Sequence, residues 1–408
     1  MPDRLPDRVV IVGASLTGGS AAVALRSEGF DGSITLIGAE DHAPYERPPL
    51  SKEYLRGESD FEKAWVKPAA WYDENKIDTR FGVRAETIDT KDKAVVLPGG
   101  ERVPYDAALI ATGSRNRLLS SPGADLEGIL SLRYLEDSNR IKEAAKNARA
   151  AVVVGMGFIG AEVAASLRSL GLEVTAVEPA PTPLFRVLGA DIGAAMGSLH
   201  ADNGVTLMFD EIVERFEGSG RVEAAVTKSG KRLPCDIVVY GVGIDPATDV
   251  AAGTDIAVDN GIVVDEFCRT NVEGVYAAGD VANHYHPIFG RQMRVEHWQN
   301  AMRHGAHAAK SILGATEPYT EIHWFWSDQY DANLQYAGHH REWDSLVIRG
   351  SLEDRSFVAF YIKDGLVDAA VALNRGRELR RSMGLIKARK PIPEEKLRDE
   401  DVDLKALA

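Results

Sequence analysis

Cysteine is scarce in this sequence, and the two that are present, Cys235 and Cys268, stand far apart. Neither belongs to a C-x-x-C pair, so the chain has no redox disulfide between neighbouring cysteines. We therefore expect both thiols to be structural, although a pairing of the two in the folded chain stays open. We expect no metal centre either.

Long apolar runs and an excess of positive charge are missing as well. No apolar stretch reaches the roughly 18 residues that a membrane-spanning helix needs. The start, Met-Pro-Asp-Arg-Leu-Pro-Asp-Arg, has neither the apolar region of a signal peptide nor the acid-poor composition of a transit peptide, so we expect a cytoplasmic protein. The formal net charge of −14 argues against nucleic acid as the main partner, because phosphate binding needs a basic face.

What the chain does contain is two glycine loops of the kind that binds dinucleotides. Each follows an apolar run typical of a buried parallel strand and opens into a segment of small residues, which predicts a helix. Because one such loop binds one dinucleotide, two loops predict that electrons pass between two bound dinucleotides. The first loop comprises Gly13, Ser15, Leu16, Thr17 and Gly18, and the second comprises Gly155, Gly157, Phe158, Ile159 and Gly160.

The glycines of such a loop have separate functions. The first permits the tight turn, the second lets backbone N–H groups approach a pyrophosphate, and the third lets helix and strand pack closely. In the first loop Ser15 replaces the second glycine; its Cβ narrows the approach, and its hydroxyl could donate a hydrogen bond. An acidic residue that can bind the adenosine ribose should follow about 20 residues later. Glu40 and Glu178 stand at about this spacing after the first and second loops. The alternative for either loop is a tight turn without a ligand.

Two later segments share a pattern of Asp, buried strand and small-residue turn. The first ends in Ala111, Thr112 and Gly113, and the second, 235–246, contains Gly243. The repeat suggests a duplicated dinucleotide fold. Strand-like segments occupy 77–110, and a helix is predicted near 295–313. From about 320, short alternating strands indicate a smaller α+β domain, and the charged tail after about 390 is expected to pack loosely.

Taken together, these motifs resemble the flavin-dependent ferredoxin reductases of bacterial oxygenase systems, the group that includes putidaredoxin reductase. They are part of the glutathione-reductase-like class with two dinucleotide sites. The resemblance extends over essentially the whole chain and implies an α/β protein with two Rossmann-like domains and a smaller α+β domain. The implied boundaries are 1–112 with 243–320 for an FAD domain, 113–242 for an NAD domain and 321–408 for the C-terminal domain. The motifs are Gly13…Gly18, Arg47-Pro-Pro-Leu-Ser-Lys52, Ala111-Thr-Gly113, Gly155-x-Gly-x-x-Gly-x-Glu162, Gly279-Asp280 and Trp326-Ser-Asp328.

The resemblance also implies which residues bind FAD. Gly13, Gly18 and Glu40 would hold the pyrophosphate and the adenosine ribose. Arg47 would lie beside the flavin. The remaining contacts would come from Thr112 and Gly113 at the domain crossover, from Asp280 after Gly279 at the ribityl chain, and from the loop with His297 and Trp298 at the pyrimidine end of the ring.

Three residues are implied in the reaction itself. Lys52 would place positive charge near flavin N5, which accepts the hydride, and Glu162 would pair with Lys52 and bind the nicotinamide amide. Trp326 would line the nicotinamide pocket or the path of the electrons. Each has a simpler alternative: a surface lysine after a Pro-rich turn, an acid in the first turn of a helix, and a tryptophan packed in the core.

The implied activity is NADH-dependent reduction of FAD, followed by release of single electrons to an acidic [2Fe–2S] ferredoxin by a monomer or weak homodimer. Residues 374–390 carry seven basic residues and one acidic residue, and could attract such a partner if they are more than a solvated helix face. Three rivals remain: a disulfide or peroxide reductase, for which no early cysteine is present, a rubredoxin reductase, and a binding flavoprotein of the apoptosis-inducing-factor type.

Overall fold

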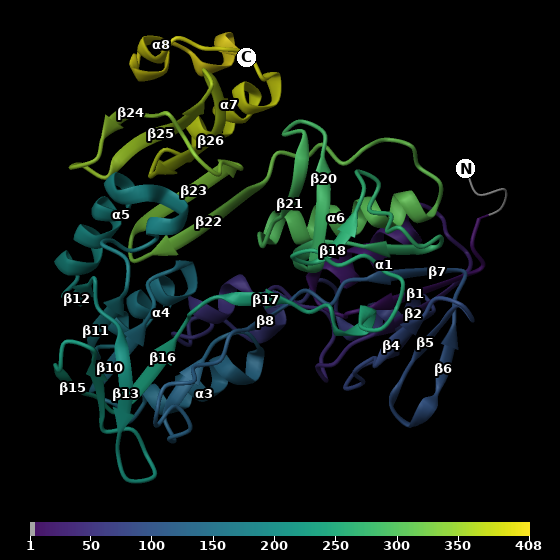
Figure 1. The fold of residues 1–408 in the computed structure, drawn as a ribbon, viewed down its shortest axis with the longest axis horizontal. Coiled ribbons are helices and arrows are strands. Elements are labelled where there is room, and N and C mark those ends of the chain that lie inside the picture. The colour runs from purple at the N-terminus through teal and green to yellow at the C-terminus, as the bar shows by residue number, and fades with distance from the viewer. Residues whose placement is uncertain (1–4) are drawn as a thin grey trace. The chain divides into compact units, whose positions relative to one another are not determined.

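A computed structural model describes residues 5–408, which form two compact units (Figure 1). Unit 1 comprises the chain up to residue 46 together with 61–115 and 245–323. Unit 2 comprises 47–60, 116–244 and 324–408. The chain passes between the units within strands β8 (Ser114–Asn116) and β17 (Ile244–Pro246), among other places.

Unit 1 is built on a five-stranded parallel sheet of order β19-β7-β1-β2-β3. Its central strand β1 is the predicted apolar run, and four of its five residues are buried. Helices α1 and α6 pack together so closely that a Cβ on Gly305 would lie 2.3 Å from the Thr17 carbonyl oxygen. The elements are β1 (Arg8–Val12), α1 (Leu16–Ser27), β2 (Ser33–Ile37), β3 (Ile77–Arg80), β7 (Ala107–Ile110), β19 (Val275–Ala277) and α6 (Trp298–Ile312).

Smaller elements complete unit 1. Strands β4 (Thr87–Asp89), β5 (Ala94–Val96) and β6 (Arg102–Pro104) form one antiparallel sheet. Strands β18 (Ile262–Val264), β20 (Ala282–His286) and β21 (Arg291–Arg294) form a mixed sheet, and α2 (Ala69–Glu74) precedes β3. The strands predicted within 77–110 and the helix predicted near 295–313 are thus confirmed.

Unit 2 repeats the parallel design with the second glycine loop. Its first sheet has the order β12-β11-β10-β16-β9 and is parallel throughout. The elements are β9 (Ile129–Ser131), α3 (Leu135–Ala145), β10 (Ala150–Val154), α4 (Phe158–Ser169), β11 (Glu173–Glu178), α5 (Phe185–Asp202), β12 (Thr206–Phe209), β16 (Ile237–Tyr240) and the antiparallel strands β13 (Val213–Glu217), β14 (Ala224–Thr227) and β15 (Arg232–Pro234).

The remainder of unit 2 is an antiparallel sheet followed by helices, as the change of pattern near 320 predicted. The sheet has the order β22-β23-β26-β25-β24 (Figure 1). The elements are β22 (Trp324–Gln329), β23 (Ala332–Gly338), β24 (Ser345–Ser351), β25 (Ser356–Lys363), β26 (Leu366–Leu373), α7 (Gly376–Ala388) and α8 (Glu394–Arg398).

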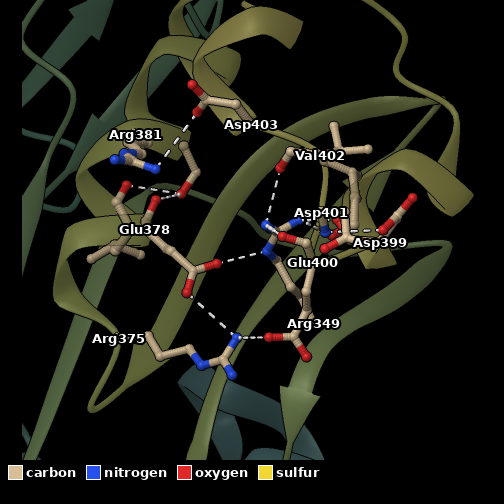
Figure 2. Close-up of polar contacts among 12 residues, drawn as sticks. Arg349, Arg375, Glu378, Arg381, Asp399, Glu400, Asp401, Val402 and Asp403 are labelled. Carbon is tan, nitrogen blue, oxygen red and sulfur yellow. Dashed lines mark hydrogen bonds and ion pairs between the residues drawn. The ribbon is translucent and has the colours of Figure 1, made fainter.

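The prediction of a loosely packed tail is wrong. Arg349 of β24, 4% exposed, pairs with Glu378 of α7 and donates hydrogen bonds to four carbonyl oxygens of the tail (Figure 2). Leu397 and Leu404 of the tail are also buried. The many charged residues of the tail suggested loose packing, but they are interspersed with these buried leucines. In addition, the tail backbone is bound by an arginine that precedes it in the sequence. The four acceptors are the carbonyls of Leu397, Asp399, Glu400 and Val402.

The three-domain division stays a prediction, because the two compact units are a coarser grouping. Unit 2 combines the predicted NAD and C-terminal domains and adds residues 47–60. Among residues 5–408, no helix has both the length and the apolar character required to cross a membrane.

Candidate active site

The first glycine loop lies at the carboxyl edge of the parallel sheet of unit 1. Gly13 follows β1 with a φ of +116°, and a Cβ there would lie 2.2 Å from the Ala111 carbonyl oxygen, so the turn requires glycine. A Cβ on Gly18 would lie 1.8 Å from the Gly13 carbonyl oxygen. The loop therefore brings helix α1 against the strand edge, with its N-terminal N–H groups available to an anion.

The middle position of each loop tolerates a side chain. Gly157 has an ordinary φ of −69°, and a Cβ there would meet nothing within 4 Å. Ser15, in the same place of the first loop, caps α1 with a φ of −109° and makes no capping hydrogen bond with its side chain. Ser15 therefore introduces no backbone strain, and its hydroxyl is available to a phosphate oxygen.

The second loop has the same construction and a fixed acidic partner. Gly155 has a φ of +91°, and a Cβ there would lie 2.4 Å from the Gly241 carbonyl oxygen; one on Gly160 would lie 1.9 Å from that of Gly155. Glu178, the last residue of β11, accepts hydrogen bonds from the N–H of Met156 at 2.6 Å and of Ala180 at 2.9 Å. Its carboxylate is thus held beside the loop before any ligand binds.

Neighbouring strands of unit 1 add further predicted residues to the same sheet edge. A Cβ on Gly279, whose φ is +76°, would lie 2.2 Å from the Thr17 hydroxyl oxygen, which places the turn after β19 against the first loop. Ser114 donates to the carboxylate of Asp280 at 3.4 Å. Carboxyl ends of parallel strands are where ligands bind in open α/β sheets.

The rest of the predicted set in unit 1 has defined partners. Glu40 lies three residues beyond the end of β2, and its carboxylate accepts a hydrogen bond from the hydroxyl of Tyr45. Thr112 donates to the carbonyl of Ala247 at 2.7 Å. His297 is the N-cap of α6 and Trp298 its first residue, so a helix N-terminus does occur at this place.

A buried ion pair is the centre of the polar site in unit 2. Lys52 and Glu162 are 5% and 4% exposed, and Lys52 Nζ lies 3.3 Å from Glu162 Oε2. The hydroxyl of Ser51 donates to the same carboxylate oxygen, and the hydroxyl of Ser327 donates to Glu162 Oε1 at 2.7 Å. Such a pair is costly to desolvate and persists only where additional hydrogen bonds compensate.

This geometry rules out two of the simpler alternatives. Lys52 follows a short 3-10 helix, Pro48–Ser51, but it is buried and therefore not a surface lysine. Glu162 lies beyond the first turn of α4, which contains no acidic residue. Ser51 and Ser327 were not among the site residues predicted from the sequence. The available signal was their position inside the motifs that contain Lys52 and Trp326.

Strand β22 presents Trp326 on one face and Ser327 on the other, because its burial alternates along the strand. The Lys52 ammonium lies 5.9 Å from the centroid of the Trp326 ring, which stacks on Trp324 with centroids 5.4 Å apart. The indole N–H of Trp326 donates to the carboxylate of Asp328 at 2.9 Å. Trp326 is only half-buried, which argues against simple core packing.

The structure distributes the predicted residues between the two units. Arg47 belongs to unit 2, where its guanidinium lies 5.0 Å from the centre of the Tyr134 ring and donates to the Arg133 carbonyl. Unit 1 contains Gly13, Ser15, Leu16, Thr17, Gly18, Glu40, Ala111, Thr112, Gly113, Gly279, Asp280, His297 and Trp298, and unit 2 contains Arg47, Lys52, Gly155, Gly157, Phe158, Ile159, Gly160, Glu162, Glu178, Gly243 and Trp326.

Both cysteines are buried free thiols, so the pairing that the sequence left open is not formed. Burial raises the pKa of Cys235 to about 11 and that of Cys268 well above its ordinary value. Both therefore remain protonated and unreactive near neutral pH. Within residues 5–408, no group of three or more His, Cys, Asp and Glu side chains is arranged to hold a metal ion.

The basic stretch of residues 374–390 is partly neutralised by the tail. Arg375 lies 2.6 Å from a Glu400 carboxylate oxygen, and Arg381 lies 3.6 Å from one of Asp403 (Figure 2). Arg377 and Arg380 are exposed and form no ion pair with any residue between 5 and 408. The unneutralised positive charge of α7 is thus smaller than the sequence indicated.

Comparison with known proteins places this geometry in a family. Rhodocoxin reductase of Rhodococcus erythropolis is 37% identical over 97% of this chain and 93% of its own. The anthranilate 1,2-dioxygenase system ferredoxin–NAD(+) reductase component of Burkholderia cepacia is 38% identical over 98% and 99%. The covalent putidaredoxin reductase–putidaredoxin complex contains a chain of the same fold, with a TM-score of 0.94, 34% identity and 98% of both chains covered.

The family descriptions agree with these relatives and with both halves of the structure. The pyridine nucleotide-disulphide oxidoreductase family matches residues 7–305, and the reductase C-terminal family matches residues 324–408. The chain therefore belongs to the pyridine nucleotide-disulphide oxidoreductase family and carries its reductase-type C-terminal domain.

Proposed function

We propose that the chain is an FAD-dependent NADH:ferredoxin reductase that serves an oxygenase. The observation that carries the proposal is the pair of glycine loops, each with a φ-positive glycine that leaves no room for a Cβ. Two relatives of similar length, a ferredoxin–NAD(+) reductase component and rhodocoxin reductase, support the reaction. Two buried, protonated thiols argue against the rival reduction of disulfides.

The residues of unit 1 fit FAD. The loop with Gly13 and Gly18 and the N-terminus of α1 bind the pyrophosphate, with the Ser15 hydroxyl as an additional donor. Glu40 binds the adenosine ribose, Asp280 binds the ribityl chain, and the N-terminus of α6 at Trp298 stabilises negative charge at the pyrimidine end of the ring. Bound there, FAD would supply the redox chemistry: a centre that takes up a hydride from NADH and passes single electrons to a [2Fe–2S] ferredoxin.

The residues of unit 2 fit NADH. The loop with Gly155 and Gly160 binds its pyrophosphate, and Glu178 binds the adenosine ribose. Lys52 and Glu162 act at the reacting end of the nicotinamide: the ammonium supplies positive charge, and the carboxylate keeps the ammonium in place and accepts from the amide. Trp326 covers this end and limits the access of water. The domain boundaries and the cytoplasmic location given above belong to this proposal.

Steady-state reduction of different acceptors tests the proposal. With NADH as donor, we expect a small [2Fe–2S] ferredoxin and ferricyanide to be reduced much faster than glutathione disulfide or hydrogen peroxide. Rubredoxin serves as the comparison among iron proteins. Faster turnover with rubredoxin or with a disulfide would contradict the assignment.

A matched pair of glycine variants tests the second loop. Gly155→Ala places a Cβ 2.4 Å from the Gly241 carbonyl oxygen, whereas Gly171→Ala, at a φ of +94°, meets nothing within 4 Å. The two substitutions therefore introduce similar backbone strain and differ in the clash. We expect Gly155→Ala to lose NADH-dependent reduction while retaining FAD, and Gly171→Ala to keep both. Loss of activity in both variants would show a general destabilisation instead.

A further inference from the structure

A continuous chain of buried polar side chains lies behind the Glu162 carboxylate. Ser327 Oγ is 2.7 Å from Glu162 Oε1, Gln329 Nε2 is 3.0 Å from Ser327 Oγ, and His200 Nε2 is 2.8 Å from Gln329 Oε1. The hydroxyl of Tyr330 completes the chain, 3.3 Å from His200 Nδ1. Ser327, Gln329 and His200 are each at most 1% exposed.

The hydrogen bonds of this chain can all be made in only one direction when Glu162 is ionised. A serine hydroxyl has one proton, and the carboxylate can only accept, so Ser327 donates to Glu162 and accepts from the amide of Gln329. The amide oxygen of Gln329 then faces His200, which must carry its proton on Nε2. The unprotonated Nδ1 of His200 accepts from Tyr330. Every donor in the chain therefore points toward Glu162.

Burial supports this direction. It lowers the pKa of His200 to about 4, so the imidazole is neutral near pH 7 and has one donor and one acceptor, as the chain requires. It raises the pKa of Tyr330 to about 12, so that hydroxyl keeps the proton that it donates. Both shifts are caused mainly by desolvation.

The position of these side chains shows that packing alone does not explain them. Ser327 and Gln329 share the buried face of β22 with Phe325, whose ring packs against Phe158 of α4 at 4.7 Å between centroids. Apolar residues would fill this face without the cost of burying an amide and a hydroxyl. The Ser327 hydroxyl gives Glu162 Oε1 its hydrogen bond from β22, and the amide of Gln329 donates to that hydroxyl in turn.

We propose that Ser327, Gln329 and His200 are positioning residues that orient the Glu162 carboxylate, and through it Ser51 and Lys52, for hydride transfer. Ser327, at the end of the hydrogen-bond chain, fixes Glu162 Oε1, so Oε2 is turned toward Ser51 and Lys52. The inference rests on the proposed function, because it assumes that Lys52 and Glu162 act at the reacting end of NADH. It adds residues that were not assigned to either cofactor above and that act through Glu162.

The first experiment observes the chain without turnover. The FAD-loaded protein, with 15N-labelled histidine, is studied by NMR through two-bond 1H–15N couplings, and the His200 signals are assigned by their loss in His200→Gln. Between about pH 6 and pH 8, above the pKa of about 4, we expect a neutral ring with its proton on Nε2. In Gln329→Leu the two tautomers should mix. A parent ring that is charged, or protonated on Nδ1, would overturn the proposal.

The second experiment measures flavin reduction by NADH in a stopped-flow instrument. Ser327→Ala removes a hydrogen bond to a charged group, so the rate constant of reduction should fall about tenfold, with a smaller change in the Kd of NAD+ measured by calorimetry. Ser327→Thr keeps the hydroxyl and should restore most of the rate. A loss that is confined to binding, or that Thr does not rescue, would overturn the positioning role.

A matched serine provides the control. Ser382 of α7 is also fully buried, and among residues 5–408 its hydroxyl donates only to the carbonyl oxygens of Glu378 and Leu379. Ser382→Ala should leave the rate constant unchanged; equal losses in Ser327→Ala and Ser382→Ala would reduce the role of Ser327 to stability. If NADH does not reduce the flavin of the parent protein, the proposed function is contradicted. The NMR experiment tests the hydrogen-bond chain independently of that outcome.

Discussion

At the scale of single residues, we expect Glu178 to determine which nicotinamide nucleotide the protein prefers. Two backbone N–H groups hold its carboxylate at the end of β11, where a 2′-phosphate would meet like charge. The parent should therefore have a higher kcat/KM for NADH than for NADPH, and Glu178→Gln should reduce that ratio by about tenfold. The following Pro179-Ala-Pro181 offers no arginine to bind the phosphate.

The control for this prediction lies on the same strand. Glu173 is exposed at the other end of β11, so Glu173→Gln makes the same chemical change away from the loop and should leave the ratio as it is. A parent that uses NADPH as well as NADH would show that Glu178 does not select the nucleotide.

The two cysteines give a second prediction at this scale. With a pKa of about 11, Cys235 has a thiolate fraction of about one in a thousand near pH 8, and Cys268 has less. The native protein should thus react slowly with an aromatic disulfide reagent, more quickly as the pH rises toward 11, and with both thiols only after unfolding. The Cys235→Ala/Cys268→Ala variant should keep its FAD and its ferricyanide reduction. Rapid labelling of the native protein, with loss of activity, would restore the disulfide-reductase alternative.

At the scale of secondary structure, β24 and the tail depend on one arginine. Arg349→Met removes a partly buried ion pair with Glu378 and leaves the carbonyl oxygens of Leu397, Glu400 and Val402 without the guanidinium donor. The Asp399 carbonyl loses the same donor but still accepts from the N–H of Val402 at 3.2 Å. We expect a loss of about 3–5 kcal/mol in the free energy of unfolding, measured by urea titration with CD detection. Arg398→Met is the control, because the pair of Arg398 with Glu394 is exposed, at 3.9 Å. Similar stabilities of the two variants would show that the tail is not anchored by Arg349.

At the scale of the whole molecule, this chain is acidic, and the ferredoxin proposed as its partner is expected to be acidic too. The formal net charge of −14 would repel an acidic partner. Helix α7 offers local positive charge, because Arg377 and Arg380 are exposed and form no ion pair with another residue among residues 5–408. Arg377→Glu/Arg380→Glu should raise the KM for ferredoxin and flatten its salt dependence, because exposed charges are screened over about 8 Å at physiological ionic strength. The rate of flavin reduction by NADH should not change.

A second charge reversal separates a local effect from one of net charge. Lys228 and Lys231 are exposed at the turn between β14 and β15, and Lys228→Glu/Lys231→Glu changes the net charge by the same amount. Steady-state kinetics of the parent and both variants over a salt series should separate them. Equal increases in KM would mean that α7 has no specific part in docking.

Much of this molecule follows from local sequence patterns, and the rest depends on contacts between distant residues. The loops at Gly13 and Gly155 could be predicted from a few consecutive residues, because the glycines that permit a positive φ are visible in the loop sequence itself. His200 could not be predicted in the same way, since its partner Gln329 lies 129 residues away. Only the alternation along β22, which buries Gln329, offered a signal.

The hydrogen bonds from Arg349 to the tail have a consequence for the order in which the protein folds during synthesis. The carbonyl groups that accept its hydrogen bonds follow the arginine by 48 to 53 residues. When β24 leaves the ribosome, those residues have not yet emerged, and its guanidinium cannot be buried without them. We therefore expect the antiparallel sheet of unit 2 to become stable only after the tail has been synthesised. Strands β10 and β11 are neighbours in the chain and can pair as soon as both have emerged. A nascent chain stalled before residue 397 should consequently be recognised by chaperones through this sheet, even when its parallel sheet is already folded.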